Sequence, residues 1–278
     1  MGVQQYGTEL DRLLSKVYRE TGHDYREYRA GTVTRRLEHR LHVTGALNYL
    51  DYINHLDRHP EEYHNLANAL SINTSVFFRN PNTFEQLNRL ILPELVASKR
   101  DQVNPTLNFW SAACARGEEP YSIAIQISEF LAGENHHFES TVYATDINQT
   151  ALEQAMAGIY PLQEIEGLEA DIRSRYFRRH DQAYTVRDSL RQMLRFSHFD
   201  LTSHEEMPFQ ELDAVFCCNV LIYMQAQLQE RVLTRIYHSL ATHGYLILGE
   251  VETPPRELRN RLECLDYKAR IYRKSEVF

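Results

Sequence analysis

The chain is short of several residue types, and each shortage excludes a class of protein. Only 11 glycines and 9 prolines occur among 278 residues, too few for a long linker or a low-complexity tail. No apolar run approaches the roughly 20 residues of a membrane-spanning helix. The N-terminal residues lack the basic start and apolar core of a signal peptide. We therefore expect a folded cytoplasmic protein without membrane insertion.

The chain also has few cysteines, and its net charge is negative. The cysteines form no CxxC pair, and none of the 13 histidines lies in an HExxH-like set, so we expect no metal. The four cysteines are Cys114, Cys217, Cys218 and Cys264. A net charge of −8 argues against a nucleic-acid-binding protein. Five arginines between residues 26 and 40 nevertheless make one local basic region.

The first part of the chain has the apolar spacing of helices. Four stripes recur at intervals of three and four residues: Leu10, Leu13, Leu14, Val17; Val33, Leu37, Leu41; Tyr49, Leu50, Ile53, Leu56; and Tyr63, Leu66, Ala67, Leu70. Pro60 is expected in the first turn of the fourth helix. We predict a helical domain over residues 1–75 and a linker or helix over 76–104.

From residue 105 the pattern changes to short apolar runs that alternate with helices. The expected strands are 106–112, 140–146, 194–200, 213–219 and 244–250, and the expected helices are 120–131, 149–157 and 225–240. This alternation predicts βαβ units and a mostly parallel sheet. Residues 264–274 are expected to add an antiparallel edge strand. Seven strands with the last one antiparallel are typical of a Rossmann-like class I S-adenosylmethionine-dependent methyltransferase domain, here 105–278.

Residues 176–196 interrupt this rhythm. They carry short alternating apolar runs and no helical stripe. We predict an excursion from the main sheet that forms a small antiparallel β-subdomain.

The loop after the first expected strand, 111–120, contains small residues and two carboxylates, Glu118 and Glu119. A phosphate-binding loop avoids carboxylates because its helix N-terminus receives an anion. A ligand with an ammonium and a sulfonium group, such as S-adenosylmethionine, would be attracted by them. The alternative is that the glutamates only stabilise the helix N-terminus.

Asp146 ends the second expected strand. A carboxylate at this place can accept hydrogen bonds from both hydroxyls of a ribose. Alternatively, Asp146 caps the following helix, although Asn148 could cap it equally well. Together with the glutamate loop, Asp146 favours an adenosine-containing ligand.

The segment 71–80 joins the two parts. As structure alone it is a linker that buries Phe77 and Phe78. Arg79 directly follows this apolar pair, and an arginine in that position indicates a functional role.

Four segments together resemble the chemotaxis-receptor methyltransferase (CheR) family over nearly the whole chain. They are NTSVFFRN at 73–80, FWSAACARGEEPYSIA at 109–124, VYATDI at 142–147 and VFCCNVLIYM at 215–224. The resemblance implies a receptor-docking helical domain and a methyltransferase domain. It also implies that S-adenosylmethionine is the methyl donor, S-adenosylhomocysteine the product, and a glutamate of a methyl-accepting chemotaxis receptor the substrate.

Carried over by position, the resemblance assigns ten site residues. Cofactor contacts fall on Asn73, Ser75, Arg79, Glu119, Asp146, Asp200, Leu201, Cys218 and Asn219, and the catalytic roles fall on Arg79 and Tyr223. We expect Arg79 to orient the substrate carboxylate and Tyr223 to donate a hydrogen bond to it.

The chain departs from the family pattern at a few positions. Asp200 stands where the family has asparagine, Cys218 where it usually has arginine, and Gly249-Glu250-Val251-Glu252 where it commonly has GxSE. Two other functions therefore stay open: a methyltransferase for another carboxylate, and a weakly catalytic or regulatory relative that binds S-adenosylmethionine.

The basic region suggests how a receptor could be recognised. On a continuous helix Arg29, Arg36 and Arg40 share one side, which suits the acidic methylation region of a chemotaxis receptor. The alternative is that these arginines only form a solvent-exposed helix face and have no role in docking. We expect a monomer, and we expect the charged excursion at 176–196 not to bind a receptor tail pentapeptide.

Overall fold

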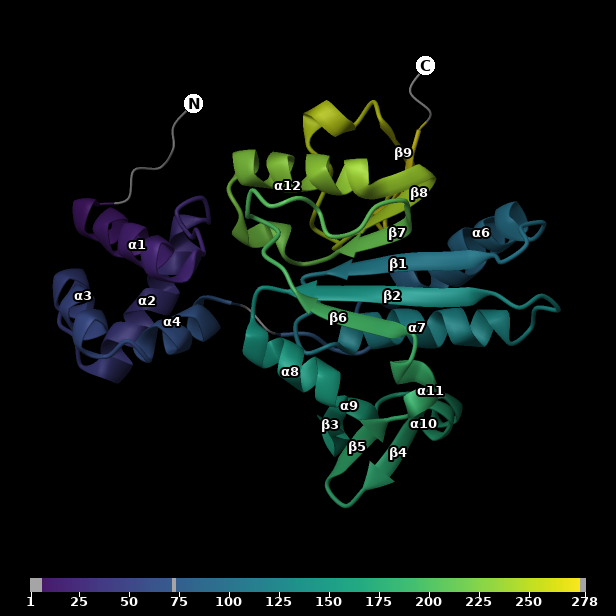
Figure 1. Ribbon diagram of the computed structural model, residues 1–278, viewed down its shortest axis with the longest axis horizontal. Coiled ribbons are helices and arrows are strands. Elements are labelled where there is room, and N and C mark those ends of the chain that lie inside the picture. The colour runs from purple at the N-terminus through teal and green to yellow at the C-terminus, as the bar shows by residue number, and fades with distance from the viewer. Residues whose placement is uncertain (1–6, 72–73, 276–278) are drawn as a thin grey trace.

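The computed structural model describes residues 7–71 and 74–275. Figure 1 shows a helical domain beside a larger α/β domain. The helical domain consists of α1 (Thr8–Thr21), α2 (Ala30–Thr44), α3 (Tyr49–Arg58) and α4 (Glu62–Leu70). Most residues of the predicted stripes face one another there and form one core, in which Leu13, Leu14, Leu37, Leu56 and Leu66 are fully buried. Leu50 of the third stripe is instead 38% exposed, so its expected place in the core was wrong.

Pro60 lies before α4 and not in its first turn, so this expectation was wrong. Its carbonyl accepts a hydrogen bond from the Tyr63 N–H at 3.2 Å, in a tight turn that leads into the helix. Proline suits such a turn because its φ is already fixed.

A nearly continuous helical stretch follows the segment between the domains. It comprises α5 (Pro81–Gln86), the π-helical turn η1 (Leu87–Ile91) and α6 (Leu92–Lys99). Leu87, Ile91 and Leu92 are fully buried in the larger domain's core, so this stretch packs as part of that domain.

The seven-stranded sheet has the strand order β6-β2-β1-β7-β8-β10-β9, which confirms the predicted fold class. Its strands are β1 (Thr106–Ala112), β2 (Glu139–Asp146), β6 (Leu194–His198), β7 (Leu212–Cys217), β8 (Leu240–Leu248), β9 (Leu262–Asp266) and β10 (Ile271–Lys274). The helices between them include α7 (Glu118–Leu131), α8 (Gln149–Ala157) and α12 (Ala226–Ser239), with short 3-10 turns η2 (Leu221–Tyr223) and η3 (Arg256–Leu258). The carboxyl ends of the parallel strands face the helical domain (Figure 1).

The closing segment 264–274 forms two strands where one was predicted. The turn between them is stabilised by the Asp266 carboxylate, which accepts the backbone N–H groups of Lys268 and Ala269, both at 2.8 Å. β10 therefore returns between β8 and β9 and pairs antiparallel with both, so that β9 is the edge strand.

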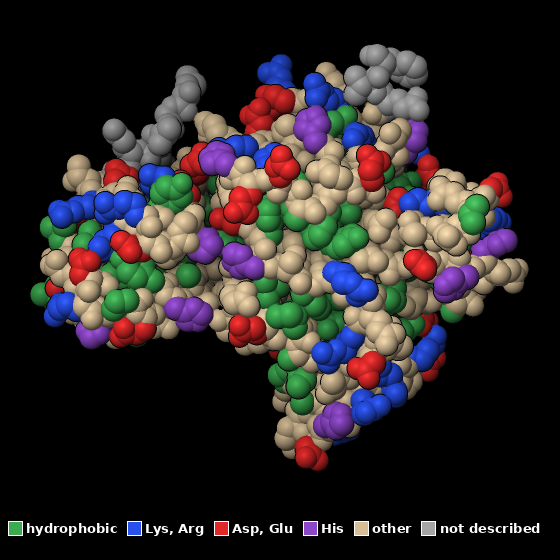
Figure 2. Space-filling model, in the orientation of Figure 1, with side chains coloured by type: hydrophobic (Ala, Val, Ile, Leu, Met, Phe, Trp, Pro, Cys, Tyr) green, Lys and Arg blue, Asp and Glu red, His purple; other side chains and the backbone are tan. Residues whose placement is uncertain are grey.

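A second, three-stranded antiparallel sheet projects from the large one (Figure 1) and forms the protrusion at the bottom of the space-filling view (Figure 2). It contains β3 (Ile159–Pro161), β5 (Ala183–Val186) and β4 (Phe177–His180), accompanied by α9 (Leu162–Ile165), α10 (Ala170–Tyr176) and α11 (Asp188–Arg191). The antiparallel element expected within 176–196 therefore exists, but its third strand comes from an earlier part of the chain. Residues 194–196 belong instead to β6 of the main sheet.

One carboxylate is buried within the helical domain. The Glu62 side chain is only 5% exposed and accepts two hydrogen bonds from the Arg40 guanidinium, at 2.8 and 2.6 Å. The Tyr52 hydroxyl donates a further bond to it at 2.7 Å. Arg40 thus has its charge neutralised inside the domain, which weakens its predicted role in receptor docking.

Replacing Glu62 with alanine should destabilise the helical domain, because it leaves Arg40 and Tyr52 without their partner. We expect a loss of about 2–3 kcal/mol in the free energy of unfolding by urea. The matched control is Glu61→Ala, since the Glu61 side chain is 71% exposed. Equal stability of the two variants would contradict the structural role of Glu62.

Candidate functional site

A cavity of about 320 Å³ lies between the two domains, at the carboxyl ends of the strands. Of the predicted site residues, it is lined by Ser75, Arg79, Glu119, Asp146, Cys218, Asn219 and Tyr223. A smaller adjoining cavity shares Asp146 with it and adds Asp200 and Leu201. The fold therefore brings nine of the ten predicted residues to one place. Asn73 lies outside the described residues.

The loop after β1 has a strained backbone that brings it close to its neighbours. Ala113 and Ala115 have φ angles of 68° and 49°, in a region that non-glycine residues rarely occupy. Gly117 has φ of 96°, and a Cβ atom there would lie 2.8 Å from the Cβ of Ala155 and 2.9 Å from the Tyr160 hydroxyl. Only glycine fits at residue 117, and α7 begins directly after it.

The two glutamates of this loop point to different places. Glu118 is completely buried and pairs with Arg116 at 2.7 Å. Glu119 turns back to β1, where its carboxylate accepts a hydrogen bond from the Ser111 hydroxyl at 2.7 Å, and it lines the cavity. Burial raises the pKa of Glu119 to about 7, although Ser111 and Cys218 oppose the shift. Stabilisation of the helix N-terminus alone does not account for a carboxylate in this position.

Asp146 is free of the capping role that was its alternative explanation. Asn148 caps α8, because its side chain accepts the Ala151 N–H at 3.0 Å. The two carboxylate oxygens of Asp146 accept backbone N–H groups of Ala115 and Asn148, at 2.7 and 2.8 Å. Burial raises the pKa of Asp146. The carboxylate is thus fixed at the cavity wall with further lone pairs available.

The turn after β7 is held by Glu252, which the sequence did not mark as a site residue. Its buried carboxylate accepts the N–H groups of Asn219 and Gly249, both at 2.8 Å, and that of Ile222 at 3.2 Å. Asn219 itself has φ of 59°. The motif of Gly249 and Glu252 was the available sequence signal, and its role is to fix the turn that carries Asn219 and Tyr223.

Cys218 occupies the same turn, beside Glu119. Its thiol lies 3.7 Å from the Ile247 carbonyl oxygen. Burial and then the neighbouring carboxylate of Glu119 raise the pKa of this thiol well above its usual range. Cys218 is therefore a neutral thiol, and it is poorly nucleophilic.

Arg79 lies at the exposed rim of the cavity. The residues on both sides of it, Phe78 and Asn80, have positive φ angles of 50° and 61°. Phe77 is buried as predicted, with its ring centroid 4.9 Å from that of Tyr160, whereas Phe78 is only half-buried. This anchored but strained turn presents the Arg79 side chain toward the cavity.

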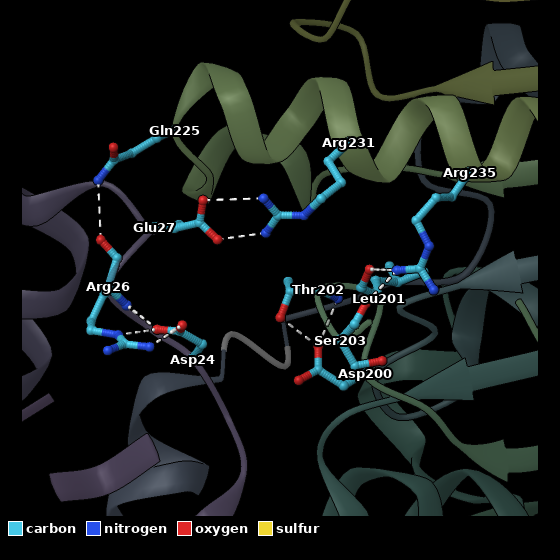
Figure 3. A network of polar contacts seen from close by, with 10 residues as sticks. All are labelled: Asp24, Arg26, Glu27, Asp200, Leu201, Thr202, Ser203, Gln225, Arg231 and Arg235. Atoms are coloured by element: carbon cyan, nitrogen blue, oxygen red, sulfur yellow. Dashed lines mark hydrogen bonds and ion pairs between the residues drawn. The ribbon is translucent and has the colours of Figure 1, made fainter. Parts of the chain in front are cut away.

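The helical domain supplies one wall of the cavity through Tyr25 and Tyr28. Residues 27–29 of this domain pair with residues 223–225, in the turn before α12. The Arg29 N–H donates to the Tyr223 carbonyl at 2.8 Å, and the Gln225 N–H donates to the Glu27 carbonyl at 2.9 Å. Two further contacts, the Glu27–Arg231 ion pair and a bond from the Gln225 amide to the Arg26 carbonyl, are visible in Figure 3. This wall was not predicted from the sequence, although aromatic residues clustered between two helices were a usable signal.

The loop after β6 carries Asp200 and Leu201. The Arg235 guanidinium reaches over from α12 and donates to the carbonyls of Leu201 at 3.1 Å and Ser203 at 2.5 Å (Figure 3). The Asp200 carboxylate accepts the N–H and the hydroxyl of Thr202, at 2.8 and 2.7 Å. This loop is therefore fixed by α12 and by its own side chains.

The residues present fit a cationic nucleoside ligand. Glu119 is a half-buried acceptor whose charge lacks a full partner, and the buried Oδ1 atom of Asn219 has no hydrogen-bond partner among the described residues. Both suit an ammonium group, while Asp146 suits ribose hydroxyls. Together with the strand order, this cavity defines a class I S-adenosylmethionine-dependent methyltransferase.

Comparison with known proteins gives the family. The model "CheR methyltransferase, all-alpha domain" matches residues 8–71, and "CheR methyltransferase, SAM binding domain" matches 73–271. The chain belongs to the CheR methyltransferase family.

Named relatives agree with this assignment. A chemotaxis protein methyltransferase of Borreliella burgdorferi is 32% identical over 249 residues, with 88% of each chain covered. Chemotaxis protein methyltransferase 2 of Pseudomonas aeruginosa is 34% identical, covering 88% of this chain and 86% of that one. Among solved structures, a TehB-like methyltransferase of Corynebacterium glutamicum matches 80% of this chain and 96% of its own, with a TM-score of 0.37 and 12% identity.

Two kinds of feature are absent from the described residues. No helix among them is both long and apolar enough to cross a membrane. Within residues 7–71 and 74–275 there is also no group of three or more histidine, cysteine or acidic side chains placed to hold a metal ion.

Binding of S-adenosylhomocysteine should strengthen as the pH rises through about 7, the pKa to which burial raises Glu119. An ammonium group favours the ionised carboxylate, so below this pH binding must release a proton from Glu119. Calorimetry from about pH 5.5 to about pH 8.5, in buffers of different ionisation enthalpy, measures the affinity and the released proton. The Glu119→Gln variant should show a flat profile. A flat profile in the unmodified protein would contradict the assignment.

Asp146→Ala should weaken S-adenosylhomocysteine binding by about 1.5–3 kcal/mol, because a charged hydrogen-bond acceptor is lost. The control is Asp266→Ala, which removes a carboxylate that also accepts two backbone N–H groups but lines neither of the two cavities. Unchanged calorimetric affinity of the Asp146 variant would refute its role at the ribose.

Proposed function

We propose that this methyltransferase transfers the methyl group of S-adenosylmethionine to glutamate side chains of methyl-accepting chemotaxis receptors. The observation that carries the proposal is the distribution of charge in the cavity. Its interior walls carry the carboxylates of Glu119 and Asp146, which suit a cationic cofactor. Its rim carries Arg79, which suits a carboxylate substrate. The names of the relatives, chemotaxis protein methyltransferases, support the same substrate class.

The reaction needs little acid–base help from the protein. S-adenosylmethionine supplies a methyl group that its sulfonium already activates. A glutamate side chain with a pKa of about 4.3 is ionised at neutral pH, so no general base is required. Arg79 orients the substrate carboxylate and Tyr223 donates a hydrogen bond to it. The walls from both domains exclude water and hold the reacting groups in line.

Receptor docking is proposed to use the basic face of α2, with the protein acting as a cytoplasmic monomer. Of the three arginines, Arg40 is paired with Glu62, and the Nε of Arg29 donates to the Met224 carbonyl at 3.2 Å. Arg36 faces a groove between α2 and α4, and is the arginine of the three best placed for an acidic helix. The groove is lined by Arg35, Arg36, His39, Arg40, Asn65, Asn68 and Ala69.

Replacing Arg79 with alanine should reduce turnover about 100-fold, because the substrate carboxylate loses its orienting partner. Tyr223→Phe should reduce it about tenfold, since one hydrogen bond is lost. The measurement is transfer of a labelled methyl group to purified receptor methylation region, read as base-labile methyl ester. Melting temperature serves as the folding control.

The same assay separates the competing functions. Transfer to a small carboxylate but not to receptor would favour a different substrate. Cofactor binding without any transfer would favour a regulatory relative. Full activity of the Arg79→Ala variant would disprove the orienting role. A gain of activity in Cys218→Arg would show that this departure from the family pattern lowers the rate.

Arg36→Ala should raise the KM for receptor several-fold and make it less sensitive to salt, because exposed charges attract only within about 10 Å at 0.1 M salt. Arg58→Ala is the matched control, since Arg58 is exposed on α3, away from the groove. Calorimetry should detect no binding of a receptor tail pentapeptide, because β4, an edge strand of the small sheet, is only 4 residues long and carries the charged Arg178 and Arg179. Micromolar pentapeptide affinity, or a salt-independent KM, would overturn this docking scheme.

A further inference from the structure

A histidine of the helical domain reaches the cofactor site from outside the methyltransferase domain. His23 follows Gly22, which ends α1 with φ of 76°, and its backbone N–H donates to the Thr21 hydroxyl at 3.2 Å. The Nδ1 atom of His23 then lies 3.4 Å from Oδ2 of Asp200. Both side chains are largely buried, with exposed fractions of 19% and 10%.

Asp200 is held so that it remains an ionised acceptor. Burial alone would raise its pKa, but the hydrogen bonds from His23 and Thr202 outweigh burial, so that the pKa lies below its usual value. Thr202 occupies Oδ1, whereas His23 contacts Oδ2. Arg235, the nearby guanidinium, donates to backbone carbonyls of the loop (Figure 3). Of the contacts described here, only His23 restrains Oδ2.

The position of this carboxylate gives it a chemical task. Asp200 lies two residues after the end of β6. It lines the smaller cavity, which is also lined by Asp146, the proposed ribose acceptor. An ionised carboxylate can only accept hydrogen bonds, whereas the asparagine expected here from the family pattern can accept or donate by rotating its amide. A carboxylate therefore discriminates between a base edge that carries an amino group and one that carries a carbonyl oxygen.

We propose that His23 is a positioning residue that fixes Asp200 as the acceptor for the 6-amino group of the cofactor's adenine, so that the helical domain sets the base specificity of the site. This inference rests on the proposed cofactor site. It gives the segment between α1 and α2 a task in recognising the cofactor, beyond closing the cavity.

The test compares two ligands by calorimetry: S-adenosylhomocysteine and S-inosylhomocysteine, in which a 6-oxo group replaces the 6-amino group. The unmodified protein should prefer the adenosyl compound, and His23→Ala should reduce this preference about fivefold to tenfold by releasing the Asp200 carboxylate. His23→Asn should retain most of the preference, because its amide can donate from about the place of Nδ1. Asp200→Asn should lose the preference.

The matched control is His59→Ala, which removes another histidine of the helical domain that contacts a carboxylate, Glu61, at 3.2 Å on the surface. This variant should keep the unmodified preference. An unchanged ratio in His23→Ala, with adenosyl binding intact, would overturn the inference alone. If the unmodified protein bound neither ligand, the proposed cofactor site itself would fail. Equal loss of both ligands in the alanine and asparagine variants would reduce His23 to a structural role and also refute the proposal.

Discussion

The pairing of one extended segment of the helical domain with the turn before α12 is the contact on which the site depends. Two backbone hydrogen bonds join the domains there, from Arg29 to Tyr223 and from Gln225 to Glu27. Tyr223 itself lines the cavity, and Glu27 and Arg29 flank Tyr28, which lines it from the other domain. Separation of the two domains at this point would remove Tyr25 and Tyr28 from the cavity wall and open it to water.

The site also contains residues with unfavourable backbone φ angles and carboxylates whose charged form is disfavoured by burial. Five of the nine non-glycine residues with positive φ among the described residues line the cavity or flank Arg79: Phe78, Asn80, Ala113, Ala115 and Asn219. Burial raises the pKa of Glu119, Asp146 and Glu252 together, which means that their charged forms are destabilised in the free protein. A cationic ligand would relieve this destabilisation, so part of the cost of building the site is recovered on binding.

Local pattern was sufficient to predict much of this structure. The strand β1 and helix α8 begin and end at the predicted residues, because alternation and an Asn148 cap are properties of neighbouring residues. Asp146 could be located because it ends a strand whose partners were recognisable. Three contacts could not be predicted because they join residues far apart in the chain, and the spacing of apolar residues carries no information about such contacts. They are the Glu62–Arg40 pair, the bonds of Glu252 to the turn after β7, and the His23–Asp200 contact. The division of 264–274 into two strands was missed for a related reason, since it depends on an aspartate side chain that folds back on its own turn.

Pairing between the domains maintains the cofactor site in this scheme, and one pair of variants at Gln225 tests that most directly. Gln225 has φ of −71°, and Met224 before it is extended at φ −96° and ψ 150°, so proline fits the backbone at residue 225. Gln225→Pro removes the side chain and also the backbone N–H that bonds to the Glu27 carbonyl. Gln225→Ala removes the side chain alone. The quantity to measure is the calorimetric affinity for S-adenosylhomocysteine. We predict that proline weakens it several-fold more than alanine does, at similar melting temperatures, whereas equal affinities of the two variants would contradict the claim.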